Sequence, residues 1–557
     1  MWKAPFDAFV FYLPKLIVAI LLASFVFLTK RSEWTIGLSL AIDLWCISNL
    51  MYHNANDLLI DVPAMLMASN LKGFESSLSA FFSWSYLWFV VITGLLWAVT
   101  WRVGKVERRS GKWYWIWFAL AELGNIGLCV PNWIDYYRGK VDADFDMANG
   151  RKVIQQLYGR NGWRVFIPFH AVRMSAMPDL TYYPDYGEYY TYQNSIIHYG
   201  LAMIVYYVYS SQDDIQFVTA DELRGHYDGC ALGKEVIPDK NLIVVLVESM
   251  ESWPFEMGDM SYQVAPNFME FLDYTGVVSW SRVRSEAKHG VSGDGQMLVS
   301  SGMMPLNAGA ACILYGDNVW PSYVSLFDHS AFIDISNGIW NQRTMTQQYG
   351  YKADLFDPAA KWGDKGVFEQ MCHVIDTICE PFMSMVLTGA THSPFNHHDG
   401  YQLSVPGDMP KYMLEYLECL HVTDTYFGMF WKHLKESGRL ANTVVVVTSD
   451  HTVFKPAMLR DFHLYAEDHG FVLSAEESYC PLWIYSPDNE FNVRNEALCY
   501  QMDIYPTILA EIGCETYYWR GFGENLRDTI AVQNRRFTED EAYKVSNSMI
   551  KTNWFCR

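Results

Sequence analysis

Apolar residues are crowded into the first part of the chain, where four stretches approach the length of a membrane-spanning helix. A helix needs about 20 mostly apolar residues to cross the hydrocarbon core of a bilayer. The first stretch has no small-residue cleavage site and is followed at once by the second, unlike a signal peptide. We therefore expect a transmembrane helical module over residues 1–131, with spans at about 8–29, 34–52, 80–101 and 113–131.

The loops between these stretches predict how the module is oriented. The first loop carries Lys30 and Arg31, and the third, residues 102–112, carries five basic residues and one glutamate. The second loop, residues 53–79, is acidic. Because basic loops stay on the cytoplasmic side, we expect the first and third loops to lie inside. Everything after residue 131 is then expected on the outer side of the membrane.

A fifth apolar stretch, residues 195–209, is about 15 residues long, which is short for a span. It contains a histidine and four tyrosines. We interpret it as an amphipathic helix, at about 195–211, that lies on the outer membrane surface within a linker of residues 132–238. A true fifth span is the alternative.

From residue 239 onward the pattern is that of an α/β protein. Continuous apolar runs predict strands that are buried on both faces, as in a parallel sheet. A helix is predicted at 413–438, where apolar residues recur at helical spacing and a glycine ends the pattern. We expect one domain over residues 239–557, with a mostly parallel sheet between layers of helices. The predicted strands are 242–247, 382–387, 443–447 and 481–485.

Polar residues follow three of these runs directly. Glu248 closes the first run, His392 follows the second along the chain, and Asp450 and His451 follow the third. Ligands of open α/β sheets collect at the carboxyl ends of the strands. We therefore expect one crevice that receives two carboxylates and two imidazoles, and this mixture of oxygen and nitrogen donors suits Mn²⁺, Mg²⁺ or Zn²⁺.

Charge and cysteine content narrow the function classes. The net charge of −21 argues against nucleic acid as a partner, because a phosphate backbone requires clustered Lys and Arg. An acidic protein that handles a phosphate needs local positive charge, which a bound metal ion can supply. Nine of the 11 cysteines follow residue 131 without any C-x-x-C pair, which argues against a structural zinc module.

At these positions the chain resembles the lipoteichoic acid synthase branch of the alkaline phosphatase/sulfatase superfamily. The similarity covers most of the chain, from the apolar stretches to about Leu526. The resemblance implies an α/β catalytic domain outside the membrane, carried by a bundle of membrane helices. It also implies one divalent ion, usually Mn²⁺, and cleavage of phosphatidylglycerol with transfer of glycerol phosphate through a covalent enzyme intermediate.

The resemblance assigns the metal site and the nucleophile. Glu248 in VLVESMESW matches the first metal-binding glutamate of the family, and Asp450 and His451 in TSDH match its Asp-His pair. The segment KHGVSGDGQM, residues 288–297, resembles the nucleophile segment. It places the attacking hydroxyl, which also binds the metal, at Ser292, where the synthases usually have threonine.

The resemblance also assigns the substrate pocket, with one departure. His392 in THSPF matches a substrate-facing histidine with a catalytic role, and Trp340 in IWNQR matches a tryptophan that lines the head-group pocket. Two places after this tryptophan the synthases have an arginine that grips phosphate, but this chain has Gln342, with Arg343 next to it. Either Arg343 binds the substrate instead or the head group differs.

The sequence thus predicts a multi-pass enzyme of the cytoplasmic membrane whose catalytic domain lies outside. We expect it to move the head-group phosphate of phosphatidylglycerol or phosphatidylethanolamine to a glycan or polymer of the cell envelope. Phosphoethanolamine transfer and simple phosphodiester hydrolysis are the alternatives within the fold. A true sulfatase is disfavoured because Ser292 lies in no C/S-x-P-x-R motif. A non-catalytic lipid-binding membrane protein is the alternative outside the enzymes.

Overall fold

The computed structural model describes most of the chain after residue 235 and a smaller part before it. The chain divides into two compact units, residues 1–65 with 78–214 and residues 66–77 with 215–557. The described residues are 33–56, 59–60, 62–66, 82–103, a few positions between 112 and 204, and 236–556 without 307–308, 336–338, 357–362, 406–408, 455 and 470–476.

The first unit contains helices at two of the four apolar stretches. Helix α2 (Glu33–Asn56) packs against helix α5 (Leu87–Val103), and these helices cover the stretches that begin at residues 34 and 80. The short helices α3 (Val62–Leu66) and η2 (Trp84–Tyr86) lie between them in the sequence. None of the helices in the described part of the chain is both long and apolar enough to span a membrane.

The other predicted membrane segments lie almost entirely outside the described residues. These are the spans at 8–29 and 113–131 and the surface helix at 195–211. The last of them contacts α2, because the indole Nε1 of Trp45 donates a hydrogen bond to the carbonyl oxygen of Ile196 at 3.0 Å. The number of spans and the surface helix therefore stay predictions.

The second unit is built on one sheet with the strand order β4-β3-β5-β1-β6-β7-β2-β8, and β9 pairs with β2. Among the described strands only β7 runs antiparallel to its neighbours, so the sheet is mixed but mostly parallel. The strands are β1 Asn241–Val247, β2 Val277–Arg284, β3 His329–Asp334, β4 Ala353–Phe356, β5 Phe382–Leu387, β6 Thr443–Ser449, β7 Cys480–Tyr485, β8 Val493–Asn495 and β9 Cys499–Tyr500.

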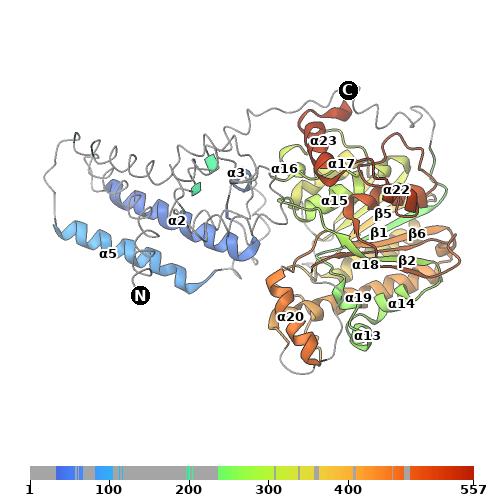
Figure 1. Ribbon diagram of the computed structural model, residues 1–557, viewed down its shortest axis with the longest axis horizontal. Helices are drawn as coiled ribbons and strands as arrows, with labels where there is room; N and C mark the ends of the chain where they lie inside the picture. Colours follow the sequence, from blue (N-terminus) through green and yellow to red (C-terminus); the bar gives the residue numbers. More distant parts are fainter. Residues whose placement is uncertain are drawn as a thin grey trace, which may run out of the picture. The chain divides into compact units, whose positions relative to one another are not determined.

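Helices cover both faces of this sheet (Figure 1), with α13, α14, α18 and α19 on one side and α15, α16 and α17 on the other. The helices are α13 Asp259–Val264, α14 Pro266–Leu272, α15 Ser292–Ser301, α16 Ala311–Leu314, α17 Gln342–Tyr349, α18 Asp364–Thr377, α19 Lys411–Glu436, α20 Pro456–His469, α21 Ile504–Glu511, α22 Thr529–Gln533 and α23 Glu539–Lys551. Short 3-10 helices are η5 Trp253–Phe255, η6 Tyr323–Leu326, η7 Ile339–Asn341, η8 Arg439–Asn442, η9 Gln501–Asp503 and η10 Trp554–Cys556.

The central strands are buried on both faces, which is why their sequences are continuous apolar runs. All seven residues of β1 and all seven of β6 are buried. Alternate residues of β1, such as Val245, belong to the core that also contains Phe268 of α14 and Phe427 of α19. These two rings stack with their centroids 4.5 Å apart. A large aromatic core thus fixes α14 and α19 against the sheet.

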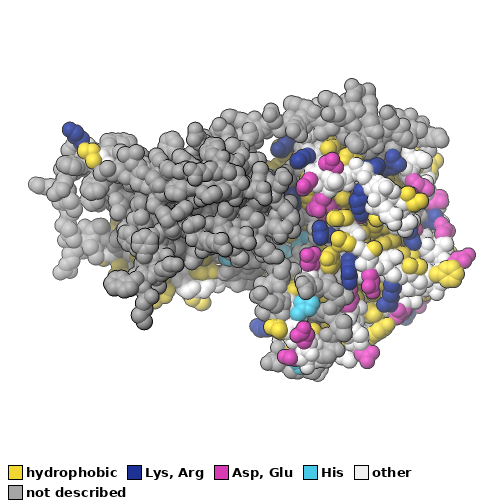
Figure 2. All heavy atoms as spheres, viewed as in Figure 1, with side chains coloured by type: hydrophobic (Ala, Val, Ile, Leu, Met, Phe, Trp, Pro, Cys, Tyr) yellow, Lys and Arg dark blue, Asp and Glu magenta, His cyan; other side chains and the backbone are white. Residues whose placement is uncertain are grey.

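The predicted strands and helix are confirmed. The four apolar runs form β1, β5, β6 and β7, and the predicted helix is α19. The strands β2, β3 and β4 were not expected from the sequence. The visible face of the second unit carries acidic and basic side chains interspersed with one another (Figure 2).

Candidate active site

The pairing of the two central strands brings the candidate metal ligands together. Strand β1 lies parallel to β6, and its last residue, Val247, is the register partner of Ser449. The residues that follow these two strands are Glu248 and Asp450, so the two carboxylates leave the sheet side by side. His451 follows at once.

These three side chains converge on one point. One donor atom from each of Glu248, Asp450 and His451 lies within 4.8 Å of the others. The imidazole Nε2 of His451 lies 3.4 Å from Glu248 Oε1 and 3.6 Å from Asp450 Oδ2. Two carboxylates and one imidazole at this spacing fit a divalent ion, as the strand ends predicted.

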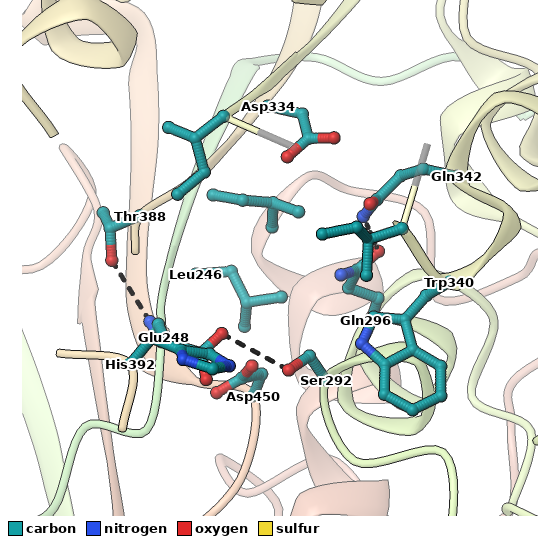
Figure 3. A pocket seen from close by; sticks show the side chains of 13 residues that line it. Leu246, Glu248, Ser292, Gln296, Asp334, Trp340, Gln342, Thr388, His392 and Asp450 are labelled. Carbon is teal, nitrogen blue, oxygen red and sulfur yellow. Dashed lines mark hydrogen bonds between the residues drawn. The ribbon is translucent and has the colours of Figure 1, made fainter. Parts of the chain in front are cut away.

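The hydroxyl of Ser292 joins this cluster (Figure 3). Its Oγ donates to Glu248 Oε2 at 3.3 Å and also lies 3.3 Å from His451 Nε2. Ser292 is the first residue of α15, where the helix dipole favours negative charge. The structure therefore brings Ser292, which the resemblance assigns as the nucleophile, to the three candidate metal ligands.

The turn before α15 holds this hydroxyl in place. Asp294 is buried, and its Oδ2 accepts hydrogen bonds from the backbone N–H groups of Lys288 and Gly290, both at 2.9 Å. Val291 takes a positive φ of 42°, which is unusual for a β-branched residue. Such strained backbone persists only when its surroundings hold it, and here the Asp294 carboxyl does so.

Hydrogen bonds around the ligands fix which atoms face the cluster. Asp450 Oδ1 accepts from the backbone N–H groups of Ser249 and His451, both at 2.8 Å, which leaves Oδ2 toward the cluster. His451 Nδ1–H donates to the carbonyl of Thr452 at 3.0 Å, which presents Nε2. Ligand residues are oriented by such partners in most metal sites.

The charges of the cluster also fit a cation. Burial would raise the pKa of Glu248, but the hydrogen bond with His451 and the charges of His392 and His451 outweigh it and lower the pKa to about 2. Burial and the adjacent Glu248 raise the pKa of Asp450 to about 7. Burial would lower the pKa of His451, but Asp450 and Glu248 raise it to about 10. Without an ion, the carboxylates thus keep His451 protonated. A bound divalent cation would take the place of this proton.

A pocket opens beside the cluster, and two of the three further residues expected there line it. His392 and Trp340 are among its walls (Figure 3). The Nδ1–H of His392 donates to the carbonyl of Ser393 at 2.5 Å, which fixes the orientation of the ring. The described lining residues are Leu246, Glu248, Ser292, Gln296, Asp334, Ile335, Ile339, Trp340, Gln342, Leu387, Thr388, His392 and Asp450.

Arg343 is not brought to the pocket. Its guanidinium pairs with the Asp354 carboxylate at 3.0 Å, and half of the side chain is exposed. The neighbouring Gln342 lines the pocket instead and donates from Nε2 to Gln296 Oε1 at 2.5 Å. The structure therefore does not support the expectation that Arg343 substitutes for the missing arginine.

Asp334, Gln296 and Thr388 line the pocket although the sequence did not mark them. Asp334 is the last residue of β3, and the signal for it was the strand end itself, which was missed because β3 was not predicted. Thr388 follows β5 directly, and its Oγ1 accepts from the backbone N–H of Glu248 at 3.1 Å. It therefore helps to fix the position of a ligand.

Comparison with known proteins finds distant relatives of this chain. A family model described as "Sulfatase" matches residues 315–513, and one described as "Lipoteichoic acid synthase N-terminal domain" matches residues 2–129. Lipoteichoic acid synthase 1 of Bacillus subtilis (strain 168) is 23% identical over 379 residues, which are 62% of this chain and 57% of the relative. The chain is therefore similar to lipoteichoic acid synthases, and over residues 315–513 it is similar to sulfatases.

Other relatives are similarly distant. A lipoteichoic acid synthase of Staphylococcus aureus (strain USA300) is 22% identical over 57% of this chain and 53% of its own length. The chain thus spans about half the length of the curated synthases that it matches. The crystal structure of the lipoteichoic acid synthase LtaP from Listeria monocytogenes has a TM-score of 0.47 and 19% identity, over 55% of this chain and 81% of LtaP.

In this chain, the C-terminal helix α23 packs against the segment that leads to Ser292. The Tyr543 hydroxyl donates to the carbonyl of Glu286 at 2.8 Å, and the ammonium of Lys288 lies 3.4 Å from the centre of the Tyr543 ring. Mainly because it is buried, Lys288 has its pKa lowered to about 8. Neither Lys288 nor His289 is among the described residues that line the pocket.

A buried carboxyl beside this helix predicts how stability depends on pH. Burial and the nearby Glu539 and Asp503 raise the pKa of Glu286 well above its ordinary value. Its Oε2 accepts from the Met502 N–H at 2.7 Å, and no donor in the described part of the chain reaches Oε1. Between the unfolded and folded pKa the native state binds more protons, so stability falls as pH rises from about 4.5.

We expect the melting temperature of the EDTA-treated protein to be lower at pH 8 than at pH 5.5, by roughly 2–4 °C for each kcal/mol lost. The variant Glu286→Gln keeps the acceptor for Met502 but cannot ionise, so the difference between the two pH values should shrink. Calorimetry at both pH values measures it. An equal difference in both proteins would show that Glu286 does not cause the pH dependence.

Proposed function

We propose that this protein is a membrane-anchored, metal-dependent phosphotransferase that moves the phosphate-bearing head group of a phospholipid to an acceptor hydroxyl. Glycerol phosphate from phosphatidylglycerol is the first candidate head group, since the curated relatives are named lipoteichoic acid synthases. The observation that carries the proposal is the convergence of Ser292 Oγ on Glu248 and His451, at 3.3 Å from each.

Glu248, Asp450, His451 and the hydroxyl of Ser292 would hold one divalent ion, for which Mn²⁺ is proposed before Mg²⁺ or Zn²⁺. Such an ion, when bound, lowers the pKa of a coordinated hydroxyl and offsets charge on phosphate oxygens. A serine hydroxyl needs this help, because it is almost wholly protonated at neutral pH.

Ser292 acts as the nucleophile in this proposal. Its hydroxyl gives its proton to water, the oxygen forms a bond to the phosphorus of the lipid, and the bond between phosphorus and the diacylglycerol oxygen breaks. The N-terminus of α15 favours the negative charge of the phosphoryl group beside Ser292. His392 donates a proton to the departing oxygen, and diacylglycerol leaves. An acceptor hydroxyl then gives its proton to His392 and forms a bond to the phosphorus. The bond between the phosphorus and Ser292 Oγ breaks, and the serine oxygen takes a proton from water.

Ethanolamine phosphate is the second candidate head group, and the lining of the pocket favours it. None of the described residues that line the pocket is Lys or Arg, while Asp334 contributes a carboxyl group. The position at which the synthases carry a phosphate-gripping arginine is the neutral Gln342, and Arg343 pairs with Asp354. A pocket of this composition suits a head group that carries its own positive charge.

The proposal places a transmembrane module at residues 1–131, a linker with a surface helix at 132–238, and the catalytic domain at 239–557 outside the cytoplasmic membrane. It is supported by the match of residues 2–129 to the synthase N-terminal model. Helix α5 also exposes large apolar side chains, including Trp88 and Leu95, which a lipid environment would cover. Anchoring raises the effective concentration of a lipid substrate. The proposed acceptor is an envelope glycan or polymer.

The test uses the full chain, purified in detergent, with labelled phosphatidylglycerol or phosphatidylethanolamine. With Mn²⁺ present we expect diacylglycerol from one of the two lipids, and EDTA should stop its release. Mass analysis of the peptide that contains Ser292 should show an adduct whose mass distinguishes glycerol phosphate from ethanolamine phosphate. Protein that binds Mn²⁺ and yet releases diacylglycerol from neither lipid would contradict the proposed function.

A further inference from the structure

The motif QMDIYP, residues 501–506, has no part in the proposed chemistry, yet its first side chain is buried between two segments of the site. Gln501 lies in η9, and none of its side chain is exposed. Its amide nitrogen Nε2 donates to two carbonyl oxygens, that of Asp450 at 2.6 Å and that of Ser449 at 3.1 Å. Both carbonyls belong to the turn that carries Asp450 and His451.

The oxygen of the same amide faces the other segment. Gln501 Oε1 accepts from the backbone N–H of Glu286 at 3.1 Å and from the Ser285 hydroxyl at 3.3 Å. These residues follow strand β2 and lead into the segment that carries Ser292. The next residue of the motif strengthens this side, because the Met502 N–H donates to Glu286 Oε2 at 2.7 Å.

The four hydrogen bonds use both donors of the amide and two positions on its oxygen, so the side chain has one orientation only. If the amide were flipped, its oxygen would face two carbonyl oxygens and its nitrogen would face a backbone N–H. Only an amide of this length satisfies a pair of acceptors on one side and a pair of donors on the other. A carboxylate of the same shape would satisfy one side and repel the other.

The carbonyl of Asp450 is confined from a second direction as well. The backbone of α15 passes so close that a Cβ built on Gly295 would lie 2.1 Å from this oxygen. Gln501 and the first turn of α15 therefore hold the Asp450 backbone from different elements. Because α15 also carries Ser292, the distance of 3.3 Å between Ser292 Oγ and His451 Nε2 depends on where this backbone is held.

We propose that Gln501 is a positioning residue that sets the distance between the nucleophile Ser292 and the ligand pair Asp450 and His451. This inference rests on the proposed function, which gives those residues their roles. Gln501 is not among the described residues that line the pocket, and it acts through the backbone that it holds. A displacement of about 1 Å at such a site lowers turnover by up to about 10²-fold.

The test compares two substitutions of nearly equal shape. Gln501→Met removes all four hydrogen bonds, whereas Gln501→Glu keeps the acceptor for Glu286 and Ser285 but loses the donors toward Asp450. For both we expect Mn²⁺ affinity, measured by calorimetry well below the melting temperature, to fall at least about tenfold. The kcat for diacylglycerol release should fall by about 10²-fold, with the KM for the lipid unchanged. The exposed Gln263, changed to glutamate, is the matched control and should behave like wild type.

The result expected of a purely structural residue is different. Such a residue would lower the melting temperature but leave the Mn²⁺ affinity and the kcat of the folded fraction unchanged, and this outcome overturns the inference. If Gln501→Glu does not fold, the same two measurements on Gln501→Met decide. If the wild type releases no diacylglycerol, the proposed function fails, but the Mn²⁺ affinities still test Gln501. If the wild type is active and the Gln501 variants bind Mn²⁺ as tightly as it does, the positioning role of Gln501 is rejected and the proposed function is not.

Discussion

Replacing Ser292 with alanine is expected to lower the release of diacylglycerol by at least about 10⁴-fold. The hydroxyl is the group at the end of the pocket that lies within 3.3 Å of both Glu248 and His451 and can form a bond to phosphorus. The variant should still bind Mn²⁺, because Glu248, Asp450 and His451 remain and three protein ligands suffice in many catalytic sites. Turnover with labelled lipid and calorimetric Mn²⁺ titration measure the two effects.

Two further substitutions control this experiment. Ser292→Thr keeps the hydroxyl and should keep detectable turnover, since the synthases usually carry threonine there. Ser301→Ala makes the same chemical change at the other end of α15, where the hydroxyl donates only to the carbonyl of Met297 at 2.7 Å. It should leave turnover close to that of the wild type. Substantial turnover in Ser292→Ala would show that another group is the nucleophile.

The central part of this fold and most of the candidate site could be predicted from the sequence, for one physical reason. Strands β1 and β6 are buried on both faces, so they appear as continuous apolar runs whose ends are easily located. Since parallel strands in register end at the same edge, Glu248 and Asp450 had to meet there. The strand ends therefore predict which residues meet as candidate ligands.

The peripheral strands could not be recognised in this way. Strand β2 reads VVSWSRVR, in which Ser279, Ser281 and Arg282 interrupt the apolar pattern. It lies toward the edge of the sheet, where part of each strand is exposed, and β4 has only four residues. Because β3 was not recognised, its terminal Asp334 could not be assigned to the pocket.

The position of Arg343 outside the pocket has a different cause. Gln342 and Arg343 are the first two residues of α17, and successive residues of an α-helix are rotated by about 100°. When Gln342 faces the pocket, Arg343 therefore points elsewhere, and Asp354 of the neighbouring β4 offers it a partner. Adjacency in sequence gave no information about which of the two side chains reaches the substrate.

Changing Gly295 to alanine is expected to have the second-largest effect, although this residue makes no polar contact with the cluster through a side chain. The new Cβ would lie 2.1 Å from the carbonyl oxygen of Asp450, well below the 3.0 Å that Cβ contacts respect. The group it meets is backbone, already held by Gln501 at 2.6 Å, so it cannot rotate away. Either α15 or the turn that carries Asp450 and His451 must move by about 1 Å.

That movement separates Ser292 from the Asp450 and His451 pair, so we expect turnover to fall by about 10²-fold or more and Mn²⁺ to bind more weakly. The melting temperature should also fall, since overpacking at a buried site destabilises by about 1–3 kcal/mol. Gly94→Ala is the matched control, because nothing lies within 4 Å of the Cβ built at that position of helix α5. Wild-type turnover and Mn²⁺ affinity in Gly295→Ala would mean that the ligand turn tolerates displacement. Both this prediction and the proposed role of Gln501 require a fixed distance between Ser292 and the Asp450 and His451 pair. That requirement would then be rejected.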